Sequence, residues 1–232
     1  LGKAFRVLDK GFVRLIDYMG NDARIVQAAR VSYGAGTKSS REDDALIRYL
    51  IENQHTSPLE QVSLTFHVKL PIFVARQLVR HRMASLNEIS GRYSILKDEF
   101  YVPEIENVHG QSKTNKQGRN ESDDELCEAT KQAFIDEYRI QADEQFLLYG
   151  QSIDSGISRE LARLNLPLST YTEWYWTIDL NNLLKFLALR MDHHAQWEIR
   201  EYANVKCELA RLVVPSVIRA YEELIFRGAR LI

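Results

Sequence analysis

The chain has 232 residues, and 45% of them are hydrophobic, which is enough for an ordinary packed core. Thirty basic residues stand against 32 acidic ones, a formal charge of −2, so the overall balance favours neither a nucleic-acid polymer nor an anionic membrane as partner. Two cysteines, Cys127 and Cys207, lack the paired spacing of a zinc site or redox motif. We therefore expect a globular protein in which any anion site is built locally.

No stretch of the sequence looks like a targeting or membrane segment. Residues 1–5 lack the apolar core of a signal peptide, and no window approaches the roughly 18 apolar residues that cross a bilayer. The first residue is Leu1 and not a methionine, so further residues before it are expected. These features predict a cytoplasmic protein.

The first quarter of the chain predicts one short strand and two helices. Residues 5–9 have a strand-like composition, and Asn21 can cap a helix that runs towards Arg30. A second helix is predicted over residues 42–53, where apolar residues recur at helical spacing and acidic residues occupy the first turn. The sequence His-Thr-Ser-Pro at residues 55–58 ends it.

The clearest strand is predicted over residues 62–70. There Val, Leu, Phe, Val and Leu alternate strictly with the polar residues Ser, Thr, His and Lys, which is the pattern of a strand with one buried face. Pro71 suits the first turn of a helix, and the apolar spacing from Ile72 to Met83 predicts that this helix ends near Ser85.

The second half predicts a polar loop followed mainly by helices. The segment from about residue 104 to residue 123 contains few large apolar side chains, which predicts a polar loop or insertion. Helices are predicted over residues 124–149, from Ser158 through Arg163, and through the C-terminal third on both sides of Pro215; residues 171–178, rich in Trp, Tyr and Thr, predict a strand. We expect a single domain over residues 1–232.

The order of these elements favours one fold class. Strands and helices do not alternate regularly, and no glycine-rich phosphate loop follows a strand. We therefore predict an α+β fold with a mixed, antiparallel-type sheet and long helices, and not a Rossmann fold.

Four arginines fall within residues 76–92, together with His81 and a single acid, Glu88. On a helix, Arg76 lies one turn from Arg80 and Gln77 one turn from His81, so two adjacent stripes of donors can converge on one phosphate-bearing ligand. The competing interpretation is a solvated basic face with surface ion pairs. Charge alone does not decide between them.

The segment also carries a specific pattern. Arg80-His81-Arg82 is followed by seven residues and then Ser90, and this closely resembles the signature of flavin-dependent thymidylate synthases. Residues 55–60 (His-Thr-Ser-Pro-Leu-Glu) and 190–198 (Arg-Met-Asp-His-His-Ala-Gln-Trp-Glu) resemble two further motifs of that family. The similarity runs in the same order from about Leu8 to Ala203, apart from the polar loop.

The resemblance implies a reaction and a set of ligands. Members of the family reductively methylate dUMP to dTMP, with 5,10-methylenetetrahydrofolate as carbon donor and with FAD, reduced by NADPH, as hydride donor. It further implies a homotetramer with active sites between subunits, and no membrane or nucleic-acid polymer as partner.

The resemblance also implies site residues. Arg190 matches the residue that assists ionisation at N3 of the uracil. The positions that match dUMP contacts are Gln77, Leu78, Val79, Arg80, Glu88, Ile89, Ser90, Gly91, Arg92, Arg163 and Arg190. The positions that match FAD contacts are Ser57, Arg80, His81, Arg82, Glu88, Asp179, Leu180, Asn181, Lys185 and His194, with His55, Asn87 and Gln196 as further residues lining the site. At 179–181 and 185 the chain departs from the family's Asn-x-Arg and Asn.

Other readings of the same residues remain. Thymidylate synthases of the other class use a cysteine nucleophile, but Cys207 lies in an apolar helical stripe and is expected to be core. His193 and His194 with Glu198 could be taken for a metal site, but the spacing offers no third ligand, and we expect no metal. A nucleotide- or RNA-binding module that uses the same arginines, and a helical interaction protein that recruits partners through its acidic loop, are the alternatives of other classes.

Overall fold

The fold was analysed in a computed structural model that describes residues 1–31, 40–113, 118–120 and 126–226. Within these residues, five strands form one sheet in the order β1-β2-β3-β5-β4, and all neighbouring pairs are antiparallel. The strands are β1 (Phe5–Val7), β2 (Gly11–Met19), β3 (Ser63–Pro71), β4 (Ala84–Glu88) and β5 (Tyr171–Asp179). Helices account for most of the remaining regular structure, so the predicted α+β class is confirmed.

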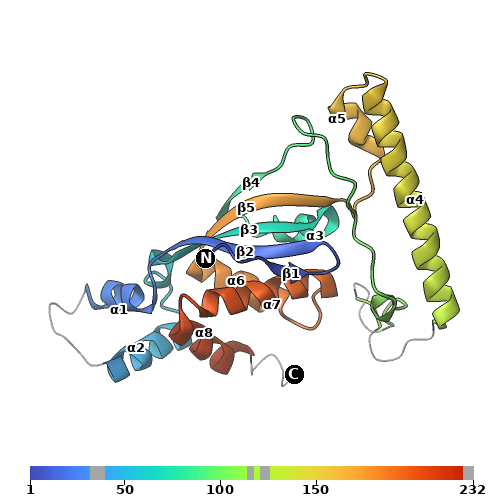
Figure 1. Cartoon of the computed structure of the whole chain (residues 1–232). Coiled ribbons are helices and arrows are strands. Elements are labelled where there is room, and N and C mark those ends of the chain that lie inside the picture. Colours follow the sequence, from blue (N-terminus) through green and yellow to red (C-terminus); the bar gives the residue numbers. More distant parts are fainter. Residues whose placement is uncertain (32–39, 114–117, 121–125, 227–232) are drawn as a thin grey trace.

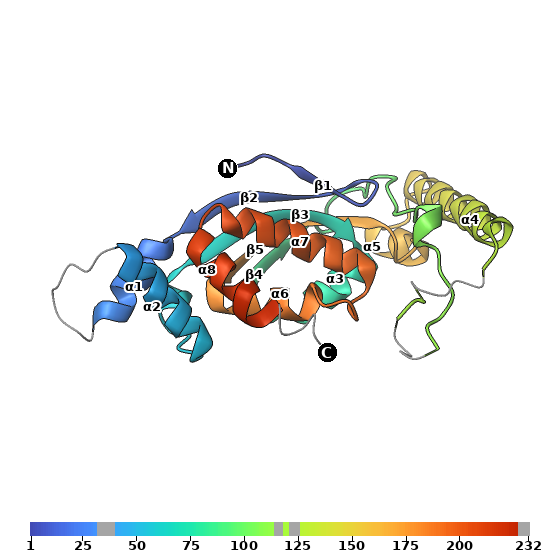
Figure 2. The same cartoon turned by 90° about the horizontal axis from the view of Figure 1, so that it is seen from below.

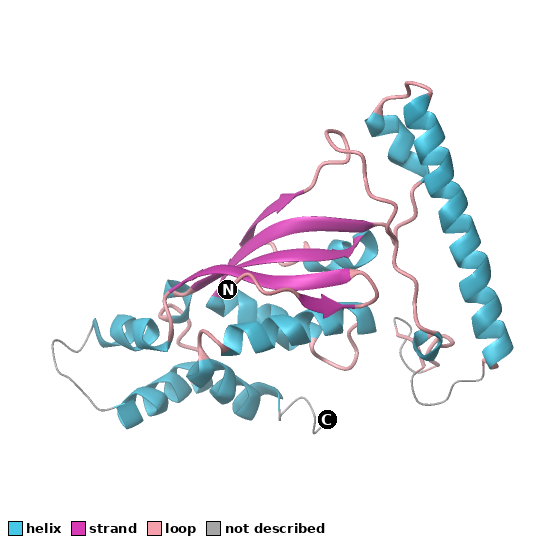
Figure 3. Ribbon diagram, viewed as in Figure 1, coloured by secondary structure: helices cyan, strands magenta, loops and turns pink. Residues whose placement is uncertain are grey.

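The helices lie on one face of the sheet and beyond its two ends (Figures 1 and 2). The eight α-helices of the described ranges are α1 (Asp22–Arg30), α2 (Ser40–Glu52), α3 (Ile72–Leu78), α4 (Glu128–Asp154), α5 (Arg159–Ala162), α6 (Leu180–Arg190), α7 (Trp197–Arg211) and α8 (Pro215–Tyr221). Helices α6 and α7 cover one face of the sheet, whereas α4 and α5 stand beyond the opposite end from α1 and α2 (Figure 3). Among the described helices, none has the length and apolar character needed to cross a bilayer.

The strands predicted from alternation are confirmed. In β3, the side chains of Leu64, Phe66 and Val68 are completely buried, because every second residue points into the layer of helices. Trp174 and Trp176 do the same from β5, and their register places them beside Val68 and Phe66. These residues form the centre of the main core.

Two strands were not foreseen, and one of them corrects the sequence analysis. The helix that begins after Pro71 does not continue to Ser85: α3 ends at Leu78, and residues 84–88 form β4, paired with β5. The exposed edge of β5 supplies hydrogen-bond partners that a helix-like spacing cannot reveal, so pairing overrides the local pattern. β2 was missed because Gly11 is its first residue, and a glycine is more typical of a turn than of a strand.

The remaining elements agree closely with the predicted boundaries. Asn21 caps α1 by accepting a hydrogen bond from the backbone N–H of Arg24. Helix α4 covers Glu128–Asp154 and therefore ends beyond the predicted residue 149. Residues 126 and 127 before it are not helical, and residues 124 and 125, where it was predicted to start, lie outside the described residues. The polar loop contains a short 3-10 helix at Ile105–Asn107 and a bridge between Gln111 and Arg119, while residues 114–117 and 121–123 lie outside the described part.

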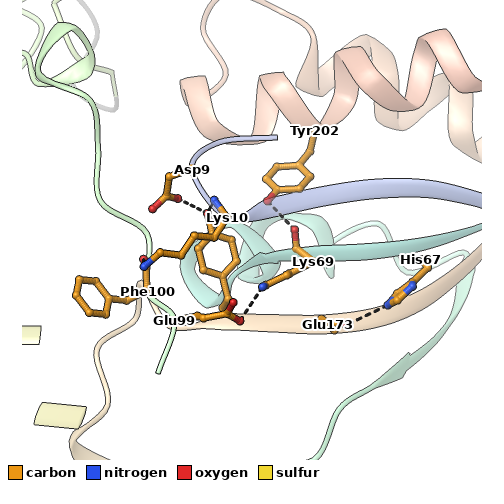
Figure 4. Close-up of polar contacts among 9 residues, drawn as sticks. Asp9, Lys10, His67, Lys69, Glu99, Phe100, Glu173 and Tyr202 are labelled. Carbon is orange, nitrogen blue, oxygen red and sulfur yellow. Dashed lines mark hydrogen bonds and ion pairs between the residues drawn. The ribbon is translucent and has the colours of Figure 1, made fainter. Parts of the chain in front are cut away.

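A second, smaller core attaches α4 and α5 to the rest of the protein. It consists of the buried residues Phe100, Ala142, Phe146, Tyr149 and Ala162. The chain segment that carries Phe100 is tied to the end of the sheet by Lys69, which forms an ion pair with Glu99 at 2.7 Å, and by Lys10, which donates to the carbonyl of Phe100 (Figure 4). The two cores are thus joined through residues 99–101.

Gly11 lies where α7 approaches the sheet most closely. Tyr202 of α7 donates a hydrogen bond of 2.7 Å to the carbonyl of Lys69, across the position that a side chain on Gly11 would occupy. A Cβ atom there would lie 2.0 Å from the Tyr202 hydroxyl and 2.9 Å from the Lys69 carbonyl oxygen. Only glycine is therefore compatible with this packing.

We expect Gly11→Ala to lower the free energy of unfolding by about 2–4 kcal/mol, because it overpacks the contact and displaces the Tyr202 hydrogen bond. Denaturant unfolding measures the change. Gly150→Ala is the matched control, since nothing lies within 4 Å of its Cβ position in α4; alanine should stabilise that helix by about 0.5–1 kcal/mol. Equal effects of the two changes would contradict this account.

Lys206 is an unpaired cation in the core. Its side chain is completely buried on α7, its Nζ has no hydrogen-bond partner among the described residues, and the rings of Trp176, Phe186 and Tyr202 surround it at 5.5–5.7 Å. Burial lowers the pKa of Lys206 to about 7. The aromatic faces offset only part of the cost of burying the charge.

We expect Lys206→Met to raise the free energy of unfolding at pH 7 by about 2–4 kcal/mol, as for other buried charges replaced by apolar groups. Between pH 7 and 10 the unfolded chain binds the lysine proton and the folded chain does not, so wild-type stability rises with pH in this window. The variant should lose that rise. Lys3→Met, which removes an exposed cation over the Phe5 ring, should change stability by less than about 1 kcal/mol; a flat wild-type profile would contradict the argument.

Candidate active site

Helices α3 and α6 run towards each other and meet by their C-terminal ends. α3 follows β3 and α6 follows β5, and these two strands are antiparallel neighbours, with Pro71 opposite Tyr171 and Ser63 opposite Asp179. The two helices therefore start at opposite ends of the sheet. Because both helices end where they meet, their carbonyl ends create a negative local potential that favours a cation.

Arg190, the last residue of α6, occupies this place. Its Nε donates to Nε2 of His81 at 3.1 Å, and its Nη2 reaches the backbone carbonyl of Gln77 at 3.4 Å. Phe186, one turn earlier on α6, packs against the His81 ring edge to face, with 4.9 Å between ring centres. Arg190 thus contacts the side chain of His81 and the backbone of Gln77. Because α3 ends at Leu78, the predicted helical stripe of Gln77 and His81 is not formed.

The contact fixes the charge of both partners. Burial and the positive charge of Arg190 lower the pKa of His81 to about 4, so the imidazole is neutral at pH 7 and its unprotonated Nε2 accepts the hydrogen bond. Burial also lowers the pKa of Arg190 from its ordinary value of 12.5, but a guanidinium keeps its proton near neutral pH. A half-buried cation is therefore held in place by a neutral ring.

A chain of side-chain hydrogen bonds leads away from Gln77. The Gln77 amide donates to Oε1 of Gln196, and Gln196 in turn donates to Glu198 at 2.8 Å. Glu198 is only 3% exposed, and it also accepts two bonds of 2.6 and 2.7 Å from Arg119 and one of 3.3 Å from the hydroxyl of Tyr101. The polar loop that carries Arg119 is thus connected to Gln77.

A cavity lies on the outer side of this ion pair. Its volume is about 400 Å³, and Tyr101, Arg119, Glu198 and Phe134 are among the residues that line it. Burial and the adjacent Glu198 carboxylate raise the pKa of Tyr101, so its hydroxyl remains protonated and donates to Glu198. The cavity is separated from Gln77 by Glu198 itself.

The turn after β4 forms a second group of predicted site residues. Thr172, buried on β5, donates to the carboxylate of Glu88 at 2.6 Å, and the N–H of Ile89 donates to the carbonyl of Glu173. The Ser90 side chain accepts from the N–H of Arg92 at 3.3 Å. These bonds hold the end of β4 on the neighbouring strand.

Gly91 in this turn is buried against Arg163. A Cβ atom on Gly91 would lie 3.2 Å from Nη1 of Arg163, so the absence of a side chain allows the guanidinium to approach the backbone. Arg92 makes an ion pair with Glu160 at 3.3 Å, in which both side chains are more than half exposed. The turn thus has the Arg163 guanidinium against its backbone and carries a second guanidinium on Arg92.

The turn of residues 55–58 forms a third group. Ser57 and Pro58 line a cavity of about 430 Å³ together with residues of α1, including Arg24 and Gln27. His55 is exposed and packs against Tyr49, with 5.5 Å between ring centres. The cavity thus lies beside the first helix, and Arg190 is not among its lining residues.

The residues at the start of α6 have structural roles within this chain. Asp179 caps the helix by accepting from the backbone N–H of Asn182 at 3.0 Å. The amide of Asn181 is buried and donates to Glu60 at 3.1 Å, and Leu180 is completely buried in the core. Lys185, one turn further on, is exposed.

Asp192, His193 and His194 lie close together between α6 and α7. Their potential ligand atoms fall within 4.8 Å of one another, and His194 forms a hydrogen bond of 2.8 Å with Asp192. Both imidazoles are more than half exposed. Glu198 is not part of this group, because its carboxylate is occupied by Arg119 and Gln196.

The exposure of the predicted site residues separates them into three classes. Exposed are His55, Ser57, Val79, Arg80, Arg82, Asn87, Glu88, Ile89, Arg92, Lys185 and His194; half-buried are Gln77, His81, Ser90, Arg163, Asp179, Arg190 and Gln196; buried are Leu78, Gly91, Leu180 and Asn181. The guanidinium groups of Arg80 and Arg82 make no hydrogen bond or ion pair with any residue that the structure describes. They are therefore available to an anionic ligand.

The structure brings together some of these residues and not others. Gln77, His81, Arg190 and Gln196 form one connected cluster, whereas the Ser90 turn and the Ser57 turn have separate contacts of their own. Over the described ranges, no hydrogen bond joins the three groups. Sequence reasoning missed Arg119 and Thr172, and it named Glu198 only as the end of the 190–198 motif and as a rejected metal ligand.

Comparison with known proteins identifies the family. The family described as Thymidylate synthase complementing protein matches the chain over residues 14–216. The flavin-dependent thymidylate synthase of Treponema denticola is 60% identical over 223 residues, which cover 96% of this chain and 83% of that protein. The protein of the same name from Treponema pallidum is 54% identical over 222 residues, covering 96% of this chain and 72% of that protein.

The fold agrees with this relationship. A crystal structure of a UMP/dUMP methylase, PolB from Streptomyces cacaoi, bound with 5-Br dUMP, superimposes with a TM-score of 0.85 at 32% sequence identity and covers 95% of this chain and 98% of that one. The sequence and structure comparisons both cover nearly the whole length of the chain. The chain belongs to the family of flavin-dependent thymidylate synthases.

Proposed function

We propose that this protein makes dTMP by reductive methylation of dUMP, with 5,10-methylenetetrahydrofolate as carbon donor and NADPH as the reductant of an FAD cofactor, in de novo thymidylate synthesis. The observation that carries the proposal is the contact between the Arg190 guanidinium and a neutral His81. This arrangement, in a chain of this family, suits the activation of a pyrimidine ring.

The role of Arg190 follows from the chemistry of uracil. C5 of the ring is a poor nucleophile, and it becomes reactive when negative charge develops on N3, O2 and O4. A guanidinium fixed beside this edge stabilises that charge. In the overall reaction C5 loses its proton and bonds to the one-carbon unit, a hydride reduces that unit to a methyl group, and tetrahydrofolate leaves, so that C5–H becomes C5–CH3. His81 orients Arg190 and does not compete with it for a proton.

A covalent enzyme intermediate is not part of the proposal. Cys207 is buried in α7, and burial raises the pKa of Cys207 to about 12, so its thiol is neither accessible nor ionised. Cys127 is exposed, but it precedes α4, outside the three groups of site residues.

The Ser90 turn is proposed to bind the dUMP phosphate. Ser90, Arg92 and Arg163 offer a hydroxyl and two guanidinium groups around a glycine that permits close approach. The ion pair of Arg92 with Glu160 is exposed, and such pairs contribute little to stability, so a phosphate can take its place. Glu88, held by Thr172, lies at the beginning of the same turn.

Residues of two groups suit a flavin dinucleotide. Arg80 and Arg82 are cations without partners among the described residues, and the cavity beside Ser57 has the size and polarity for part of a large ligand. FAD, when bound, supplies the hydride. Among the remaining proposed FAD contacts, Lys185 and His194 are exposed, whereas Asp179 and Asn181 would have to use atoms not engaged with Asn182 and Glu60.

We further propose a homotetramer in which the sites are assembled between subunits. Two features support it. The three groups of site residues are not joined within one chain, and α4 exposes large apolar residues, among them Phe134, Ile140 and Leu147, that a soluble helix normally covers.

The purified protein should show flavin absorbance, or acquire it when FAD is added, and should convert dUMP to dTMP when NADPH and 5,10-methylenetetrahydrofolate are supplied. NADPH oxidation should be faster in the presence of dUMP. A module that binds nucleotides or RNA without catalysis would be colourless and inactive. Failure to bind FAD at micromolar concentration would refute the proposed function.

Arg190→Ala should retain the fold and bound flavin but lower kcat by about 10²–10³-fold, the scale of one charge-stabilising donor. Arg219→Ala is the matched control. It removes an exposed arginine of α8 that pairs with Asp44 of α2, and Arg219 belongs to none of the three groups of site residues. The rate of dTMP formation is measured for both variants under single-turnover conditions. An Arg190→Ala enzyme with wild-type kcat would eliminate the proposed role.

A further inference from the structure

The hydrogen bonds that connect Arg119, Glu198, Gln196 and Gln77 have a fixed order of donors and acceptors. We propose that Glu198 is a positioning residue that sets the orientation of the Gln196 and Gln77 amides, and that it thereby makes the site select uracil over cytosine. The inference rests on the proposed function, in which dUMP lies against Gln77.

The direction begins at the carboxylate. An ionised carboxylate only accepts hydrogen bonds, so the group of Gln196 that faces Glu198 is its NH2. The carbonyl of the same amide then points to Gln77 and requires the NH2 of Gln77 as donor. A side-chain amide can usually be turned over without a change of shape, but here the carboxylate removes that freedom from both residues.

The surroundings of Glu198 keep it in this state. Arg119 binds both carboxylate oxygens at 2.6 and 2.7 Å, and the protonated hydroxyl of Tyr101 donates at 3.3 Å. Arg119 is itself held by a bond of 2.6 Å from its Nη1 to the carbonyl of Asn107. A buried carboxylate with this many donors is fixed in position and does not exchange partners freely.

Two groups of Gln77 remain for a ligand. Its Oε1 accepts no hydrogen bond from the described residues, and its NH2 has a second hydrogen beyond the one given to Gln196. Arg190, proposed to act at N3 of the base, contacts the backbone carbonyl of Gln77. Gln77 is therefore placed at the same edge of the pyrimidine, with an acceptor and a donor in fixed order.

Uracil and cytosine differ at this edge in the order of their groups. Uracil presents a donor at N3 and an acceptor at O4, whereas cytosine presents an acceptor at N3 and a donor at N4. An amide held in one orientation pairs with only one of them, and the mismatched base leaves polar groups unpaired. If the amides could turn over, Gln77 would accommodate both.

The test is the affinity for dUMP and dCMP of the FAD-loaded protein and its Glu198→Gln variant, with dCMP measured by competition against dUMP. Glutamine at this position can offer either a donor or an acceptor to Gln196. We expect dUMP to bind about 5–30-fold more weakly, the scale of one or two hydrogen bonds, and dCMP to bind no more weakly than before. The preference for dUMP should fall by the same factor.

If Glu198 had a purely structural role, its replacement would weaken the binding of both nucleotides in the same proportion. That result would overturn the inference. Glu99→Gln is the matched control, because it removes another carboxylate from a lysine ion pair at the end of the sheet without touching Gln77 (Figure 4). It should leave the ratio of the two affinities unchanged.

Gln196→Leu provides a second route if Glu198→Gln does not fold. It breaks the same chain at a half-buried residue, and it should reduce the preference for dUMP equally; a wild-type ratio in this variant would also overturn the inference. The wild-type protein separates the two proposals. If it binds no dUMP, the proposed function fails, whereas normal dUMP binding with an unchanged ratio in the variants refutes only the role of Glu198.

Discussion

The contact between Arg190 and His81 is the constraint on which the proposed site depends. It requires the ends of α3 and α6 to meet, and they do so because the strands that precede them are antiparallel neighbours. The contact also keeps His81 neutral, since burial and the adjacent guanidinium both oppose its protonation. A cation held by a neutral ring in a partly buried place is suited to a substrate that becomes negative as it reacts.

The polar loop contributes to the same site through its charge. Sequence composition suggested an insertion without packed structure, but Arg119 from this loop neutralises the buried Glu198 on α7. Without that guanidinium, a carboxylate in this position would lose much of its compensation for burial. The loop is thus connected to Gln77 through the side chains of Glu198 and Gln196, although Arg119 lies more than 40 residues further along the chain than Gln77.

Local patterns predicted those elements whose environment the sequence itself expresses. The alternation in β3 and the aromatic residues of β5 both follow from one face being buried, and the boundaries agree. The same reasoning failed for β4, because its residues are mostly exposed and its hydrogen bonds go to β5, which lies about 85 residues further along the chain. It failed for β2 because a glycine required by the approach of Tyr202 resembled a turn.

The sequence by itself determined the family, the α+β class and the identity of the arginine-rich segment, because a motif and a periodicity are properties of consecutive residues. The helical stripe predicted for Gln77 and His81 was wrong, because α3 ends at Leu78 and His81 lies beyond the helix. Only the tertiary structure decided that both residues contact Arg190, that Thr172 holds Glu88 and that Glu198 joins Gln196 to Arg119. These contacts join segments that are distant in the chain, and their geometry depends on how the strands pair, which no local pattern encodes.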